Sequence, residues 1–507
     1  MVVALGGLVA GYGCGGSDGD GPPADGPGDG TGIGGDDAST GTTGTEGGVA
    51  ETDAGASDGA AVVDAGVDSG PVDSGPLSPS YVHYDINHIL STGQSNAVSN
   101  GGTPVLSTTQ PYANVMFNTG VMTAGSCDGD GCTVYQTPAS FLPLVEGDRF
   151  FGYAVETMSS ALANRITQAS RDVFLVGAPK PSHDLLVSLH ARSGNPYYCL
   201  RKGGCDWWAP KPYIRPFSEA LMQINSAKTI AAGLGKSYVV RAVTTLHGET
   251  DHYYPTVFPH EGTDGTPNKI KNYADALVEW QADFDSSIKA ATGQTINVPL
   301  LVAQISGWTN VPYSAILQHQ YDAHVRAPGK VVLVTPAYML PFQNDCLHYT
   351  PQSERRLGEY FAKAYNRIVF QGVPWEPVRP RSLTLAGSTL TVVYFVPAPP
   401  LVLDTTRVTD PGNFGFEYAD ASASPATITK VQVSAPDTVT ITLSKPPGAA
   451  TGKRLYYAAR SYNPAPPNVC PGPFQGPRGN LRDSDATTSR HGYDLHNWGV
   501  QFNLPIP

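Results

Sequence analysis

The middle of the chain alternates short apolar runs with longer amphipathic stretches. Five runs are rich in Val and Leu and nearly continuous, which is typical of strands covered on both faces of a parallel sheet. The intervening stretches have the spacing of helices that bury one face. Together they predict an α/β fold with a doubly wound, five-stranded parallel sheet. The predicted strands are 86–90, 172–178, 237–246, 298–306 and 330–336, and the predicted helices are 152–168, 215–233, 268–291, 312–325 and 351–369.

The last predicted helix has the clearest start. Leu357, Phe361 and Ala364 lie on one apolar stripe at helical spacing. Pro351 suits the first helical turn, and Thr350 is a suitable residue to cap it. We therefore expect this helix to begin at residue 351.

The pattern changes from residue 373 to the end of the chain. Stretches such as "SLTLAGSTLTVVYFV" and "TITKVQVSAPDTVTITLS" alternate apolar and polar residues between turns rich in Gly and Pro. This alternation predicts an antiparallel β accessory domain over 373–507, resembling a sandwich. Trp498 and Phe502 are predicted to lie in its core.

The N-terminal region has two parts of different character. Residues 1–14 form a short apolar run that ends at Cys14 and resembles a secretory signal with a lipobox-like cleavage site. Residues 15–79 are rich in Gly, Asp and Ser and lack the apolar residues that a packed core requires, so we expect a disordered linker. These features predict a secreted or lipid-anchored protein of the bacterial cell surface or periplasm. An ordinary signal peptide without lipidation is the alternative.

The charge of the chain is concentrated in this N-terminal region. The first 80 residues contain 13 acidic and no basic residues, whereas the rest of the chain contains 31 acidic and 32 basic residues. The acidic balance therefore belongs to the linker and does not describe a binding surface. Nothing indicates the clustered Lys and Arg of a nucleic-acid groove.

The cysteines favour disulfides. Without Cys14, six of the seven remain, and six cysteines allow 15 pairings. Proximity in sequence favours two local bonds, which leaves one long-range bond. No zinc spacing is present, and "CDGDGC" lacks the terminal Glu of a calcium loop, so we expect no metal site. The predicted pairs are Cys127–Cys132, Cys199–Cys205 and Cys346–Cys470.

Three polar clusters follow predicted strands. Ser95 follows the first strand in "GQSNA", "HGETD" (247–251) follows the third, and "NDCLH" (344–348) follows the fifth. The carboxyl ends of parallel strands meet at one edge of a sheet, where active sites of this architecture form. A serine, a histidine and an acidic residue at that edge are the components of nucleophilic catalysis.

These three blocks resemble those of the SGNH/GDSL hydrolase superfamily, and the resemblance covers about 81–370. Within that superfamily they are similar to the sialate O-acetylesterase-like group of carbohydrate esterases, which has GQSN-type, QGE[ST]D-type and DxxH blocks. The resemblance implies an esterase domain over 80–372 with a flavodoxin-like sheet. It implies Ser95 as the nucleophile, His348 as the general base and then acid, and Asp345 as the residue that orients His348.

Two departures from the family pattern affect the oxyanion site. His247 stands where the third block normally has an amide side chain, so either His247 donates to the oxyanion or it is an ordinary buried histidine. In the second block, Ser182 or His183 stands where a glycine is expected. The other residues expected at the oxyanion site or pocket are Gln94, Asn96, Gly248 and Glu249.

The resemblance implies an exported serine esterase that removes O-acetyl groups from a carbohydrate through an acyl-enzyme on Ser95, with no cofactor. An esterase for aryl, lipid or polyester substrates is one alternative, and a non-catalytic carbohydrate-binding surface protein is another. The expected partner is an ester substrate, with membrane attachment only through a lipid on Cys14. Aromatic residues of two insertions either stack on sugars or pack the loops; they are Trp207, Trp208, Tyr213, Tyr253, Tyr254 and Phe258.

Overall fold

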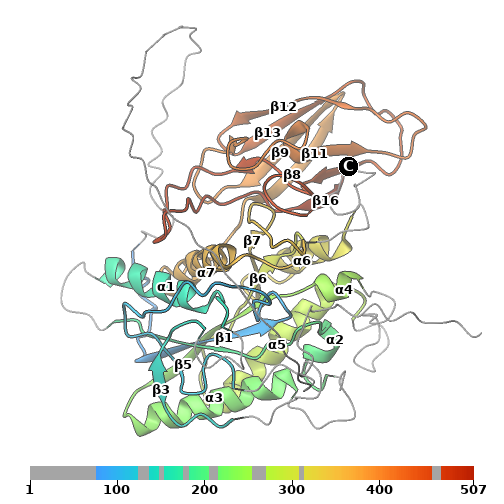
Figure 1. The fold of residues 1–507 in the computed structure, drawn as a ribbon. Coiled ribbons are helices and arrows are strands. Elements are labelled where there is room, and N and C mark those ends of the chain that lie inside the picture. The colour runs from blue at the N-terminus through green and yellow to red at the C-terminus, as the bar shows by residue number, and fades with distance from the viewer. Residues whose placement is uncertain are drawn as a thin grey trace, which may run out of the picture. The chain divides into compact units, whose positions relative to one another are not determined.

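The computed structural model combines a mostly parallel sheet with separate antiparallel sheets (Figure 1). All described residues belong to one compact unit, Asp68–Pro507. Within them, no helix is long and apolar enough to cross a bilayer. The described ranges are 76–123, 136–147, 154–174, 182–204, 215–253, 270–307, 313–459 and 470–507. The predicted signal segment, nearly all of the predicted linker and the Cys127–Cys132 pair lie outside these ranges.

The main sheet has seven strands in the order β3-β2-β4-β1-β5-β6-β7. The five longer strands and the short β2 are parallel, which is one parallel strand more than the sequence predicts, and β3 pairs antiparallel with β2 at one edge. The parallel strands are β1 (Ile86–Gly93), β4 (Leu185–Leu189), β5 (Tyr238–Leu246), β6 (Leu300–Gln304) and β7 (Val331–Pro336). The short additional strands are β2 (Val115–Phe117) and β3 (Phe141–Pro143).

Helices cover both faces of this sheet (Figure 1). Consecutive residues of β1 point to opposite sides. Ile89 packs in the core with helices α1 and α7, and Leu90 packs in the core with α3 and α5. The doubly wound arrangement follows from strands that are buried on both faces. The long helices are α1 (Ser159–Phe174), α3 (Pro216–Gly233), α5 (Tyr273–Thr292), α6 (Ala315–Arg326) and α7 (Pro351–Tyr365).

The start of α7 agrees with the prediction. Thr350 caps the helix by accepting a hydrogen bond from the Ser353 backbone, and Pro351 occupies the first turn. Gly358 lies where α7 crosses α1, since a Cβ there would be 2.4 Å from the Met158 carbonyl oxygen. The helix continues into a π-helical turn, η2 (Asn366–Phe370).

The second predicted strand, 172–178, is wrong. The helix α1 continues to Phe174, residues 175–181 lie outside the described ranges, and the strand is β4. Ser188 interrupts the apolar run of β4, but its hydroxyl is satisfied by His88 Nε2 at 2.8 Å and by Gln223 at 2.8 Å. A buried serine with such partners fits a strand interior, although it weakens the apolar pattern in the sequence.

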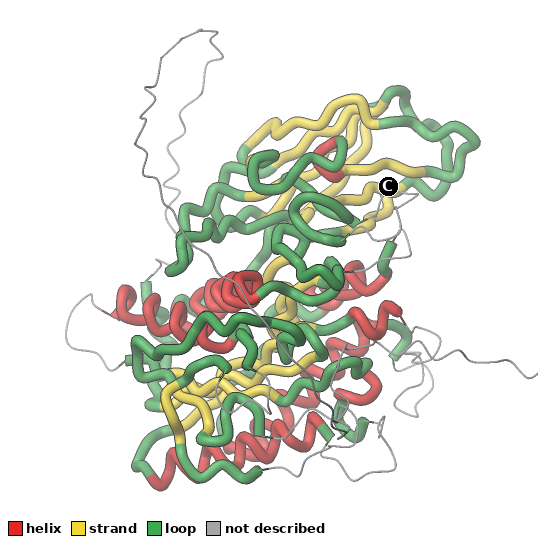
Figure 2. Tube along the Cα trace, viewed as in Figure 1, coloured by secondary structure: helices red, strands yellow, loops and turns green. Residues whose placement is uncertain are grey.

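The C-terminal region consists mainly of strands and loops (Figure 2), in agreement with the predicted antiparallel β region. Trp498 and Phe502 are buried in its core, as predicted. One sheet has the order β12-β13-β9-β8 and another the order β11-β14-β16, with β10 and β15 as a separate pair. The strands are β8 (Arg379–Ala386), β9 (Thr389–Phe395), β10 (Val402–Leu403), β11 (Phe416–Ala419), β12 (Ile428–Ala435), β13 (Thr438–Leu443), β14 (Arg454–Tyr457), β15 (Leu481–Arg482) and β16 (Phe502–Pro505).

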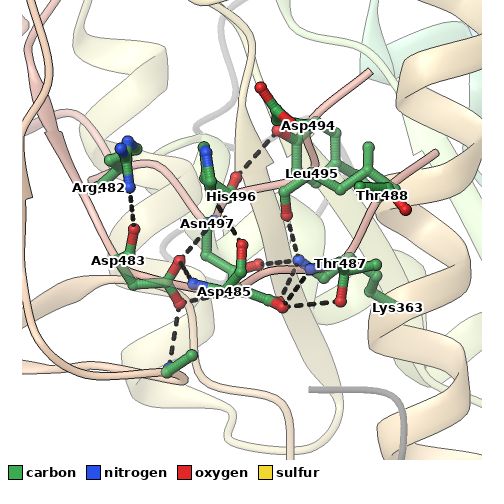
Figure 3. A network of polar contacts seen from close by, with 12 residues as sticks. Lys363, Arg482, Asp483, Asp485, Thr487, Thr488, Asp494, Leu495, His496 and Asn497 are labelled. Atoms are coloured by element: carbon green, nitrogen blue, oxygen red, sulfur yellow. Dashed lines mark hydrogen bonds and ion pairs between the residues drawn. The ribbon is translucent and has the colours of Figure 1, made fainter. Parts of the chain in front are cut away.

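A buried lysine fixes the C-terminal segment to α7 (Figure 3). The Lys363 ammonium group donates to Asn497 Oδ1 and forms an ion pair with Asp485, each at 2.7 Å, and it also donates to the Leu495 carbonyl. Asn497 in turn donates to Asp483, whose pKa is raised to about 6 because burial outweighs the attraction of Lys363. The buried charges of this network are therefore stabilised by their hydrogen-bond and ion-pair partners.

We expect Lys363→Met to lower the free energy of unfolding by about 3–5 kcal/mol, because Asp485 would remain buried without its cation. Urea unfolding of the two proteins measures the difference. Lys330→Met is the matched control, because Lys330 is exposed. Equal losses for the two variants would contradict the structural role of the network.

Three buried carboxyl groups lie close together behind the loop that follows β1. Glu156 accepts hydrogen bonds from Ser107 and Arg355, whereas both carboxyl oxygens of Glu354 are buried and have no partner among the described residues. Burial, followed by repulsion from the other two carboxylates, raises the pKa of Glu354 well above its usual value. Burial and the charge of Glu156 raise the pKa of Glu146 to about 7.

These raised pKa values predict a pH-dependent stability. The buried carboxyl groups favour the folded state when they are protonated, and this contribution to the free energy of unfolding is fully present below about pH 4.5. For Glu146 the contribution is lost as the pH rises through about 7. We expect Glu354→Gln to raise the free energy of unfolding at pH 8 by at least about 1 kcal/mol, with little change at pH 4.5. Urea midpoints at the two pH values test this, and parallel curves for wild type and variant would refute it.

Candidate active site

The serine loop leaves the carboxyl end of β1 through a sharp turn. Gly93 has φ +132°, and a Cβ at this position would be 2.2 Å from the Leu246 carbonyl oxygen, so only glycine fits. Ser95 follows in a turn that is closed by the hydrogen bond from Asn100 N to Ser95 O at 3.0 Å. This close approach of β1 to β5 places Ser95 beside the loop that follows β5.

Gln94 connects the serine loop to the "HGETD" block. Its side-chain oxygen accepts hydrogen bonds from Thr250 N at 3.1 Å and Gly248 N at 3.4 Å. Helix α4 (Glu249–Tyr253) begins immediately after Gly248. Gln94 and Gly248, both expected at the site, therefore position its loops through this contact.

Asn96 connects the serine loop to the histidine loop. Its amide donates to Glu249 Oε1 at 2.8 Å and to the Leu347 carbonyl at 3.3 Å, and its oxygen accepts from Tyr349 N at 3.3 Å. Leu347 and Tyr349 are the two sequence neighbours of His348. The residue that follows Ser95 is thus bonded to the backbone on both sides of His348, which brings these two residues together.

Asp345 orients His348. The Asp345 carboxylate lies 2.5 Å from His348 Nδ1, and its other oxygen accepts from the backbone N–H groups of Leu347 and His348, each at 3.0 Å. Partial burial would raise the pKa of Asp345, but these hydrogen bonds outweigh it and hold the pKa at about 2. Asp345 is therefore ionised at neutral pH and favours the imidazole tautomer with its proton on Nδ1.

The other ring nitrogen of His348, Nε2, is not engaged by Asp345. His348 Nε2 is buried and makes no hydrogen bond to the described residues. It does not bond Ser95 Oγ in this structure; catalytic hydrogen bonds of this kind often shorten only when substrate is present. The arrangement supplies a hydroxyl, a base and a group that orients the base.

Glu249 is fully buried behind this pair. Burial raises its pKa, whereas the hydrogen bond from Asn96 and the positive charge that His348 acquires lower it. Its second oxygen, Oε2, is buried without a partner among the described residues. Glu249 thus contributes to the site by holding the Asn96 amide.

His247 does not face the serine. Its Nδ1 lies 2.6 Å from the Tyr273 hydroxyl, and its Nε2 lies 3.0 Å from the Asn195 carbonyl oxygen and 3.4 Å from the Asp251 carboxylate. Since both ring nitrogens are engaged, the second of the two expectations, a satisfied buried histidine, describes it. His247 connects its own block to the loop that follows β4.

Ser182 and His183 lie at the opposite edge of the sheet from Ser95. Both precede β4, and the His183 ring nitrogens bond the hydroxyls of Tyr81 and Tyr365, each at 2.7 Å. The expectation that they occupy the second block is therefore wrong, because it depended on the misplaced strand at 172–178. Burial lowers the pKa of His183 well below its usual value, which suits a neutral core residue.

The residues that follow β4 occupy the place of the second block. Arg192 N donates to the Gly93 carbonyl at 3.0 Å, so "SGN" (193–195) lies beside the start of the serine loop. Gly194 has φ +66° with open space around its Cβ position, and Asn195 Oδ1 is buried and has no hydrogen-bond partner within the part of the chain that the structure describes. A glycine followed by an amide was visible in the sequence, but the misplaced strand concealed its location.

The Cys346–Cys470 disulfide links the histidine loop to the C-terminal region, as expected. The two Cα atoms are 4.4 Å apart, and Cys346 has a φ of +63°, which non-glycine residues rarely adopt. Cys199 is also disulfide-bonded, and its expected partner, Cys205, lies outside the described residues. Among the described residues, no cluster of His, Cys, Asp or Glu has the arrangement of a metal site.

Comparison with known proteins finds similarities of structure alone. No family model and no curated protein matches the chain. A carbohydrate acetylesterase from Xanthomonas citri is similar with a TM-score of 0.49 and 13% identity, over 83% of this chain and 80% of that chain. A protein from Arabidopsis thaliana (TM-score 0.34, 17% identity) and an aryl esterase from M. smegmatis (0.29, 12%) each match 55% of this chain and 97% of their own. Two of these three solved structures are named as esterases.

If Asn96 holds the two loops together, Asn96→Ala should lower kcat of any Ser95-dependent reaction about 100-fold, because a displacement of about 1 Å has effects of this size. Steady-state kinetics measure this, and KM should change less than kcat. Asn100→Ala is the matched control in the same loop, because the hydrogen bonds that Asn100 makes to described residues use its backbone N–H and carbonyl groups, which the substitution keeps. A kcat equal to that of the control would contradict the positioning role.

Proposed function

We propose that the protein is a carboxylic ester hydrolase with Ser95 as nucleophile, His348 as general base and acid, and Asp345 as the residue that orients His348. The observation that carries this proposal is the pair of hydrogen bonds between Asn96 and the two neighbours of His348: Asn96 donates to the Leu347 carbonyl and accepts from Tyr349 N. These bonds support the proposal because they join the serine loop to a histidine whose Nδ1 is held by a carboxylate and whose Nε2 has no hydrogen-bond partner among the described residues.

The reaction proceeds in two halves. Ser95 Oγ attacks the ester carbonyl carbon while its proton moves to His348 Nε2, and the tetrahedral intermediate collapses as His348 protonates the leaving alcohol. A water molecule then attacks the acyl-enzyme, giving its proton to His348, and the second collapse releases the carboxylic acid and returns the proton to Ser95. Asp345 remains ionised throughout and stabilises the imidazolium.

The negative charge that develops on the carbonyl oxygen needs hydrogen-bond donors. The backbone N–H groups of Ser95 and Gly194 and the amide of Asn195 are the candidates, because the contact between Arg192 and Gly93 places the 193–195 turn beside the serine loop. A single donor of this type contributes about 3–4 kcal/mol to transition-state stabilisation. His247 supports the same turn through the Asn195 carbonyl.

The substrate class follows from the block resemblance. The GQSN, HGETD and DxxH blocks are similar to those of esterases that remove O-acetyl groups from carbohydrates, so we assign an acetylated carbohydrate as substrate. The Cys346–Cys470 disulfide supports export, because such bonds persist in oxidising compartments. Residues 1–14 would direct secretion, with Cys14 as the site of a lipid anchor.

We expect Ser95→Ala to lower kcat for p-nitrophenyl acetate by at least about 10³-fold, since the acyl-enzyme cannot form without the hydroxyl. Spectrophotometric release of p-nitrophenol measures the rate. Ser182→Ala is the matched control, because Ser182 is exposed at the opposite edge of the sheet. No turnover by folded wild-type protein would instead favour a carbohydrate-binding role.

A further inference from the structure

The connection between β14 and β15 reaches the ester site from two sides. Ala459, near its start, packs with Leu317 and Tyr253, the last residue of α4. Cys470, further along the connection, is bonded to Cys346 in the histidine loop. A segment of the C-terminal region is therefore attached to both the "HGETD" block and the DxxH block.

The backbone that follows Cys470 is held firmly in place. Thr409 N donates to the Pro473 carbonyl at 2.9 Å, and Thr409 Oγ1 donates to the Phe474 carbonyl at 3.2 Å. Gly472 lies against the loop that leads to His348, because a Cβ there would be 3.3 Å from the Leu340 carbonyl oxygen and 3.7 Å from the Phe342 ring. These contacts fix the position from which the Phe474 side chain projects.

Phe474 is nevertheless 68% exposed. Tyr198, at 37%, is the only other Phe, Tyr or Trp in an exposed position within the described ranges. Tyr198 lies three residues after Asn195, in the short helix α2 (Tyr197–Leu200), whose first backbone N–H donates to Asp251 of the "HGETD" block at 3.1 Å. The two exposed aromatic rings thus belong to segments bonded to the ester site from different sides.

We propose that Phe474 and Tyr198 are substrate-contact residues that stack on sugar rings on either side of the acetylated unit, so that the enzyme prefers oligosaccharide esters to small esters. This inference rests on the proposed function and specifies its substrate. Rigid aromatic rings at a wet surface are suited to the apolar faces of sugars.

The chain geometry limits how far Phe474 lies from the reaction. Its Cα is four residues from Cys470, whose Cα is 4.4 Å from that of Cys346, so it lies within about 20 Å of Cys346. Cys346 is two residues from His348. This bound keeps the Phe474 ring within reach of a sugar unit that neighbours the acetylated one.

The test compares kcat/KM for partially O-acetylated xylotetraose with kcat/KM for p-nitrophenyl acetate. We expect Phe474→Ala and Tyr198→Ala each to lower the ratio of the two values about fivefold, the size of effect typical of one aromatic contact. Phe474→Trp should restore the ratio. Leu234→Ala, an exposed apolar residue after α3 at the opposite edge of the sheet, should leave both values unchanged.

An unchanged ratio in both alanine variants would overturn the proposal. A binding measurement distinguishes a failure of this proposal from a failure of the proposed esterase function. In the Ser95→Ala background, calorimetric titration with the same acetylated xylotetraose should give a Kd about fivefold higher when Phe474 is also alanine. An equal Kd with and without Phe474→Ala would refute the sugar contact. If instead Ser95→Ala hydrolyses the ester as fast as the wild-type protein, only the proposed nucleophile is refuted.

Discussion

The side-chain amide of Asn96 is the contact on which the site depends. It satisfies three separate backbone and side-chain groups, from Glu249, Leu347 and Tyr349, each of which lies more than 150 positions from Asn96 in the chain. Inside a protein such a fully satisfied polar group is worth more than in water, and leaving its partners unpaired is costly. The same contact therefore holds together the loop that contains Ser95 and the loop that contains His348.

The C-terminal region contributes to this arrangement and is more than an appended domain. Gln501 exchanges hydrogen bonds with Gln304 of β6, Lys363 of α7 binds the 485–497 segment, and the Cys346–Cys470 bond reaches the loop that contains His348. Buried ionic and amide contacts are specific in direction and position, unlike apolar contacts. They hold the segment in one register against the parallel sheet, which an apolar interface alone would specify less strictly.

Much of this could be predicted from the sequence, because local signals and the global fold agree for most elements. Four of the five parallel strands, the start of α7 and the residues of the three blocks follow from apolar runs, a helix cap and motif spacing. The strand β4 could not be found in this way, because Ser188 breaks its apolar pattern and depends on His88 and Gln223, which are distant in sequence. That error alone placed the second block at Ser182 and His183 and hid Gly194 and Asn195.

His247 stands where the esterase blocks that the sequence resembles have an amide side chain. Its contacts in the structure explain what this difference does. An imidazole with two engaged nitrogens cannot also donate to an oxyanion, so its role is to hold the Asn195 turn through a carbonyl oxygen. In the mechanism that we propose, oxyanion donation falls to the backbone N–H groups of Ser95 and Gly194 and to the Asn195 amide, on segments joined by the hydrogen bond from Arg192 N to the Gly93 carbonyl. A backbone donor needs no particular side chain, which explains how the third block can change while the serine, the histidine and the aspartate keep their arrangement.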